Sequence, residues 1–109
     1  MLWVDQRVNI LPMNKLPDAT VEKIDQLFHE SARDDVKMLL LTQCSENLPL
    51  TSSVRDHYVR IHFAVLKLSD GKIDKLIEAI TLAQTDWRDL LVAAGFGYDT
   101  KAHLDWEVE

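Results

Sequence analysis

One stretch near the middle of the chain limits the possible folds more than any other. Residues 53–68, SVRDHYVRIHFAVLKL, carry apolar side chains on two nearly opposite faces when wound as a helix at about 100° per residue. The first face holds Val54, Tyr58, Ile61, Val65 and Leu68, the second holds Val59, Phe63 and Leu66, and a strip of Asp56, Arg60 and Lys67 remains for solvent. Such a helix needs neighbours on both sides, so the stretch predicts the central member of a helical bundle.

The same stretch has a second interpretation as a β-strand. From Val59 to Val65 the letters VRIHFAV alternate, which is typical of a half-buried strand. Two features favour the helix. The alternation fails at Leu66, and Ser53 with Asp56 has the spacing of a capping box. We therefore expect a helix, with a strand at residues 58–66 as the alternative.

The segment before this stretch predicts two helices. Asp18 follows a proline and suits an N-cap, and the apolar residues after it recur with helical spacing to about Ser31. Ser31 and Asp34 form a second possible capping box, which predicts a helix from there to about Ser45. Residues 1–17 contain two prolines and predict an extended arm, within which a short strand is an open question.

The segment after the central stretch predicts two further helices and a short last one. Ser69–Asp70–Gly71 should end the central helix, and Ser69 or Asp70 should cap a helix that runs to Ala83. Thr85–Asp86 predicts a break and a new cap, followed by a helix with Gly95 just beyond its C-terminus and Phe96 folded back against it. Residues 100–106 could form a final short helix.

These elements together predict an all-α fold. The chain has 109 residues, 47% of them hydrophobic, which suits one compact domain over residues 1–109 with a real core. We expect five or six helices in a bundle, with the extended arm laid over it. The sequence shows no internal repeat and no linker long enough to separate two domains.

The balance of charged residues limits the classes of partner that the chain is expected to bind. The chain has 18 acidic and 12 basic residues, a net charge of -6, and no Lys/Arg cluster. Binding to phosphate backbones and anionic membranes depends on basic patches, so neither nucleic acid nor a membrane is an expected partner. A helix-turn-helix outline at residues 86–106 does not change this, because Lys101 and His103 stand against Asp105 and Glu107.

Cysteine usage and the N-terminus indicate a cytoplasmic location. Cys44 is the only cysteine, which excludes an internal disulfide and a CxxC motif and suits a reducing compartment. Asp5 and Arg7 interrupt the apolar residues that a signal peptide would need, and the longest apolar run, residues 90–96, is too short to cross a bilayer. We expect no cofactor and no metal.

Histidines and acids of the central helix provide an alternative, enzymatic interpretation. His57 and His62 are five residues apart, which separates them by about 140° on a helix, so they do not face one ion as an i, i+4 pair would. A small metal-dependent or hydrolytic enzyme would need His57, His62 or Asp56 to meet groups from a neighbouring helix. We expect instead that the four histidines, His29, His57, His62 and His103, are exposed or boundary residues, and we predict no catalytic residue.

The C-terminal third concentrates aromatic residues beside charged ones. Aromatic residues and arginine dominate binding at protein interfaces, and aromatic residues also close small cores. We predict a partner-binding surface with Trp87, Arg88, Asp89, His103 and Trp106. If Leu2, Trp3 and Trp106 are exposed together, they would favour a homodimer.

The predicted function follows from these observations. Negative charge, interface residue types and the lack of a reactive motif favour a small cytoplasmic accessory or regulatory protein that acts by protein–protein binding. The partner is either a second copy of the chain or another protein, a basic one in particular. A neutraliser of a basic toxin or nuclease is a specific form of this prediction, because opposite charge speeds association.

Overall fold

The central stretch is a helix. In this computed structural model, which describes residues 15–45 and 55–108 with side chains from residue 57 in the second range, α4 spans Arg55–Ser69. Ile61 and Leu66, which lie on opposite predicted faces, are both 0% exposed. The prediction of a helix covered on two sides is confirmed, and the strand alternative at residues 58–66 is wrong. The expected cap at Ser53 lies outside the described residues.

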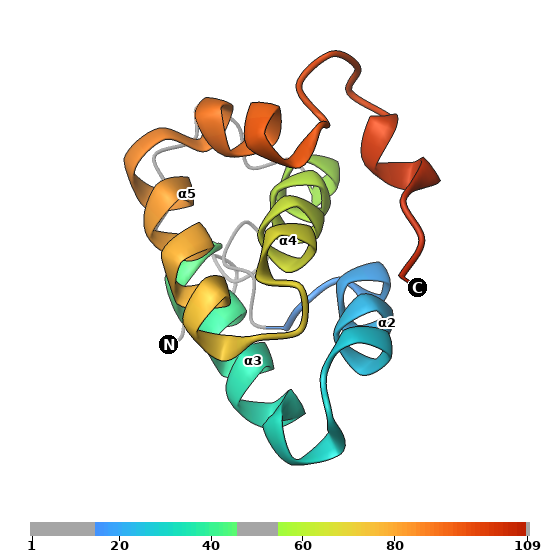
Figure 1. Cartoon of the computed structure of the whole chain (residues 1–109). Coiled ribbons are helices and arrows are strands. Elements are labelled where there is room, and N and C mark those ends of the chain that lie inside the picture. Colours follow the sequence, from blue (N-terminus) through green and yellow to red (C-terminus); the bar gives the residue numbers. More distant parts are fainter. Residues whose placement is uncertain (1–14, 46–54, 109) are drawn as a thin grey trace, which may run out of the picture.

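The described residues hold three other α-helices. They are α2 (Asp18–Leu27), α3 (Glu30–Gln43) and α5 (Ile73–Ala94), and a 3-10 helix, η1, covers Ala102–Asp105. In Figure 1, α4 lies between α5 and α2, and α3 connects these two sides below it. The most extensive packing is between α4 and α5, and α2 and η1 also pack against α4. Phe63, on the second predicted face, contacts His103 of η1 and Lys23 of α2.

The core consists of the inward faces of these helices. Burial of apolar side chains provides the main stabilisation of such a fold. Fully buried members from each helix are Ile24, Val36, Leu40, Ile61, Val65, Leu66, Leu76 and Leu90.

The helix count differs from the expected five or six. The described residues hold four α-helices, because the two helices expected on either side of Thr85–Asp86 run on as α5, with a kink at Asp86 (φ -157°, ψ 89°). The expected last helix at residues 100–106 is the single 3-10 turn η1. The predicted break is nevertheless present, since the backbone of Asp86 is not helical. The predicted N-terminal arm lies almost entirely outside the described residues.

The C-terminus of α5 follows the sequence prediction. Gly95 has φ +85°, and the N–H of Phe96 donates to the carbonyl of Leu91 at 2.8 Å. Phe96 is 2% exposed, so it folds back into the core as expected.

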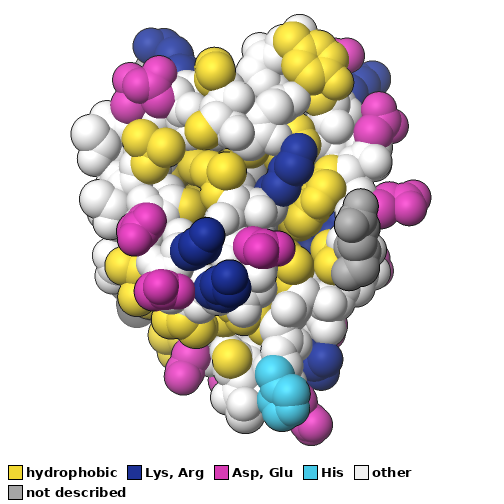
Figure 2. All heavy atoms as spheres, viewed as in Figure 1, with side chains coloured by type: hydrophobic (Ala, Val, Ile, Leu, Met, Phe, Trp, Pro, Cys, Tyr) yellow, Lys and Arg dark blue, Asp and Glu magenta, His cyan; other side chains and the backbone are white. Residues whose placement is uncertain are grey.

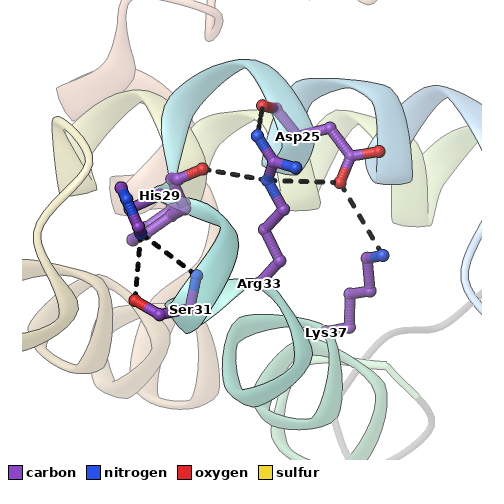
Figure 3. Close-up of polar contacts among 6 residues, drawn as sticks. Asp25, His29, Ser31, Arg33 and Lys37 are labelled. Atoms are coloured by element: carbon purple, nitrogen blue, oxygen red, sulfur yellow. Dashed lines mark hydrogen bonds and ion pairs between the residues drawn. The ribbon is translucent and has the colours of Figure 1, made fainter.

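The turn between α2 and α3 is held by ion pairs and a histidine cap (Figure 3). Arg33 donates to the carbonyls of Phe28 and Asp25 at 3.0 and 2.9 Å, and its Nε lies 3.8 Å from the Asp25 carboxylate. The Nδ1 atom of His29 accepts from the N–H of Ser31 at 3.2 Å. The expected cap at Ser31 is therefore wrong, because the preceding histidine already occupies the N-cap position.

Two other cap predictions are also wrong. Pro17, not Asp18, is the N-cap residue of α2, and Asp18 is its first residue. Lys72, not Ser69 or Asp70, precedes α5, because Asp70 and Gly71 adopt positive φ values of 52° and 76° to turn the chain. Ser69 Oγ donates to the carbonyl of Leu66 at 2.6 Å and so stabilises the end of α4.

Charged side chains of both signs are scattered over the face drawn in Figure 2. Lys and Arg side chains lie among Asp and Glu side chains there, with apolar side chains between them. Within the described residues, no helix has the length and apolar content that crossing a bilayer demands.

Candidate functional site

Trp87, Arg88 and Asp89 form the first turn after the kink in α5. Asp86 explains why the chain bends here: its Oδ1 accepts from the N–H groups of Arg88 and Asp89 at 3.1 and 3.3 Å. This carboxylate acts as an N-cap for the second half of the helix. The three residues after it therefore start from a fixed backbone.

Trp87 is partly buried and has one aromatic and one cationic neighbour. The His57 ring, from the first turns of α4, lies edge-on at 4.9 Å between ring centroids. The guanidinium carbon of Arg88 lies 5.1 Å from the Trp87 ring centroid. Arg88 and Asp89 are exposed. Burial, and to a lesser extent the charge of Arg60, lower the pKa of His57.

This arrangement suits recognition by contact. A guanidinium over an indole ring makes a cation–π contact, and its N–H groups can bind a carboxylate or a carbonyl. The indole provides a flat apolar surface beside it, and Asp89 adds an acceptor of opposite charge. We call Trp87, Arg88 and Asp89 the Trp87 surface.

His103 and Trp106 lie elsewhere, around Phe63 of α4. The ring centroids of His103 and Trp106 are 5.4 and 5.8 Å from that of Phe63. Lys23 of α2 places its Nζ 5.0 Å from the Trp106 ring and donates to the Trp106 carbonyl at 2.8 Å. The five predicted partner-binding residues thus form two groups on different elements. His103 is 5% exposed, so its side chain contributes to packing.

His62 is completely buried, contrary to the expectation of exposed or boundary histidines. Its Nε2 lies 2.8 Å from the Cys44 carbonyl and 3.2 Å from Ser45 Oγ, and its Nδ1 lies 3.1 Å from Thr20 Oγ1. A carbonyl accepts and cannot donate, so Nε2 carries the proton and Nδ1 accepts from Thr20. Burial lowers the pKa of His62 to about 4, and the hydrogen bond to Cys44 opposes this shift.

These contacts bear on the enzymatic alternative. With its proton on Nε2, His62 cannot act as a base toward Ser45, whose hydroxyl donates to the Leu40 carbonyl at 2.9 Å. Burial raises the pKa of the Cys44 thiol to about 12, which opposes its use as a nucleophile. In the part of the chain that the structure describes, no three His, Cys, Asp or Glu side chains gather as a metal site requires. The Asp56 side chain is outside that part.

Several residues of these clusters were not singled out from the sequence. Thr20 and Ser45 contact His62 over separations of 42 and 17 residues, and Lys23 contacts Trp106 over 83. A partial signal existed at His62, since Ile61 and Phe63 on either side belong to the two apolar faces and leave it little access to solvent. Nothing local marks Thr20, Ser45 or Lys23.

Comparison of the chain with protein-family models, with curated proteins and with solved structures finds no match.

Proposed function

We propose that this chain is an accessory or regulatory protein that acts by binding another protein through the Trp87 surface. The observation that carries the proposal is the position of the exposed Arg88 guanidinium over the partly buried Trp87 ring, 5.1 Å from the guanidinium carbon to the ring centroid. Tryptophan and arginine are the side chains most often responsible for binding free energy at protein interfaces. The planar fork of a guanidinium also loses little entropy for each hydrogen bond that it forms with a partner.

The support beneath this surface also favours binding. The Asp86 cap fixes the backbone of Arg88 and Asp89, and the His57 ring holds the indole of Trp87 from the side. A rigid aromatic anchor with exposed charged neighbours is what a preorganised interface offers. His62 is held in the core by hydrogen bonds and Cys44 is fully buried, so these two residues lend no support to the enzymatic alternative.

The net charge suggests the class of partner. A chain with a net charge of -6 attracts basic proteins over distances of about a Debye length, roughly 8 Å at physiological ionic strength. We therefore propose a basic protein as the partner, with a toxin or nuclease neutralised by this chain as a specific case. A second copy of the chain is the other proposed partner. A reducing cytoplasm suits the single buried thiol of Cys44.

A charge-matched pull-down tests the Trp87 surface. Tagged wild type, Trp87→Ala and Arg88→Glu are used to capture proteins from extract of the native cell. Lys75→Glu is the control, because it makes the same charge reversal at another exposed position of α5. We expect wild type and Lys75→Glu to recover one common protein that both Trp87 surface variants lose. Circular dichroism verifies that all four chains are folded.

Two outcomes count against this proposal. Equal recovery of the partner by all four chains would show that binding does not use the Trp87 surface. If no protein is specifically recovered, light scattering at high concentration tests self-binding, and a mass of 12.5 kDa throughout would exclude it.

A further inference from the structure

The last residues of the chain are attached to the helices by cationic side chains that contact backbone carbonyls. We call residues 97–108 the C-terminal segment. Arg60 donates to the carbonyls of Phe96 and Asp99 at 2.8 and 3.4 Å, and Lys67 donates to the carbonyl of Ala94 at 2.8 Å, just before the segment begins. Lys23 donates to the carbonyl of Trp106 at the far end. Because every chain has carbonyls, these contacts do not require this particular sequence.

Aromatic contacts provide the selective part of the attachment. The rings of His103 and Trp106 cover Phe63, which is 4% exposed. Lys23 places its Nζ 5.5 Å from the Phe63 ring and 5.0 Å from the Trp106 ring. The helices thus offer an apolar ring beside a cation, and the segment fills that site with a tryptophan.

The C-terminal segment has less regular structure and fewer buried side chains than α4 and α5. The regular structure of this segment is one 3-10 turn, η1. Among the described side chains of the segment, those of Ala102 and His103 are buried. Tyr98 and Leu104 are 81% and 61% exposed. Short 3-10 turns with few buried apolar side chains open at lower free energy than helices in the core. Opening would uncover Phe63 and Lys23 while α2, α4 and α5 remain packed together.

The C-terminal segment carries a net negative charge, and the cations beside it contact backbone carbonyls. The helices contribute Lys23, Arg60 and Lys67, and the C-terminal segment contains Asp99, Asp105 and Glu107 with Lys101 as its only base. The segment that naturally occupies this site is therefore acidic and anchored by an aromatic ring.

We propose that Phe63 and Lys23 form a second binding site, which takes an acidic segment of a partner protein with an aromatic anchor. The C-terminal segment occupies this site as an internal competitor when the partner is absent. Competition of this kind reduces the apparent affinity in proportion to the fraction of chains that are open. The site is separate from the Trp87 surface, so either proposal can fail without the other.

A labelled synthetic peptide with the sequence of residues 98–109, YDTKAHLDWEVE, is the probe. Fluorescence anisotropy measures its binding to the full chain and to Trp106→Ala, which removes the internal anchor and leaves Phe63 and Lys23 in place. We expect Trp106→Ala to bind the peptide about tenfold more tightly than wild type, because the internal competitor is weakened. Tyr98→Ala, which changes an outward-facing ring of the same segment, should bind as wild type does.

The contribution of Lys23 to the second binding site is tested with the double variant Trp106→Ala, Lys23→Ala. We expect it to lose the gain in affinity, and a peptide with alanine in place of its tryptophan should not bind Trp106→Ala. The proposal is overturned if folded Trp106→Ala binds the peptide no better than wild type. It is also overturned if Trp106→Ala forms dimers in place of binding the peptide, because the occupant is then a second copy.

Hydrogen exchange of wild type keeps the proposal testable if Trp106→Ala does not fold. The amides of Leu104 and Trp106, which donate within the 3-10 turn, should exchange faster than those of α4. Equal protection in both places would show that the segment does not open separately, and the proposal would fail.

Discussion

The Nε2 atom of His62, at the centre of α4, lies 2.8 Å from the carbonyl oxygen of Cys44, just after the end of α3. With Thr20 of α2 on its other ring nitrogen, the histidine joins three helices through one buried neutral side chain. In the neutral form the proton lies on Nε2, which donates to the Cys44 carbonyl, and Nδ1 accepts from the Thr20 hydroxyl. Protonation would place a positive charge in the core, where desolvation opposes it.

This geometry predicts that stability falls with pH below neutrality. An unfolded histidine titrates near pH 6.5, whereas burial lowers the pKa of native His62 to about 4. Between these values the unfolded chain binds a proton that the native chain does not. The contribution of His62 to the free energy of unfolding is therefore fully present above pH 6.5. It is lost as the pH falls toward 4, by roughly 3 kcal/mol in all. Urea unfolding at several pH values measures it.

His62→Gln isolates this contribution. The variant should be less stable than wild type near neutral pH by about 1–3 kcal/mol, because its amide satisfies the Cys44 and Thr20 groups less well. The difference should shrink toward the lower end of the window. His57→Gln is the control and should keep most of the wild-type slope, since the His57 ring is partly exposed. A constant difference between wild type and His62→Gln at all pH values would refute the assignment.

Cys44 should be unreactive in the native state. The residue is 0% exposed, and burial raises the pKa of its thiol from 9.0 to about 12. At pH 8 this reduces the thiolate fraction about a thousandfold relative to an exposed cysteine. Mass spectrometry after iodoacetamide treatment should find almost no labelling in buffer and complete labelling in urea. Rapid labelling of folded protein would contradict the buried position.

How far the sequence predicts this fold depends on the distance over which each feature is determined. The covered helix α4, the break at Asp86 and the Gly95–Phe96 ending were predicted because each depends on a few consecutive residues. The strand alternative arose because alternation treats His62 as a solvent-facing polar residue. In the fold it is buried as a neutral hydrogen-bonding group.

The helix caps and the grouping of the site residues were harder to predict from the sequence. Ser31 was a reasonable cap by type, but the chain path out of α2 brings His29 to that position first. Among the predicted partner-binding residues, sequence reasoning could group Trp87, Arg88 and Asp89 because they are consecutive. It could not separate them from His103 and Trp106, since contacts of those two with Phe63 link residues about forty positions apart.

A methyl group at Gly71 should destabilise the turn between α4 and α5. A Cβ atom there would lie 2.9 Å from the Leu27 carbonyl oxygen, and φ is +76°. Gly71→Ala should cost about 2 kcal/mol or more, from backbone strain plus the clash. Gly95→Ala is the matched control, because its φ is +85° but its Cβ would meet only Lys67 Nζ at 3.6 Å. Urea unfolding should show the smaller loss for Gly95→Ala, and equal losses would contradict the close approach of α2.

The Asp86 cap connects stability to the Trp87 surface. Asp86→Ala removes the acceptor for the N–H groups of Arg88 and Asp89 and should cost about 1 kcal/mol. It also removes what stabilises the kink, so α5 can straighten and turn Trp87 away from His57. Asp86→Asn keeps a side-chain oxygen and should retain both the stability and the contact between Trp87 and His57. Urea unfolding measures the first effect, and the nuclear Overhauser effect between the His57 and Trp87 rings measures the second. If Asp86→Ala keeps that ring contact at full strength, packing against α4 and not the cap determines the position of Trp87.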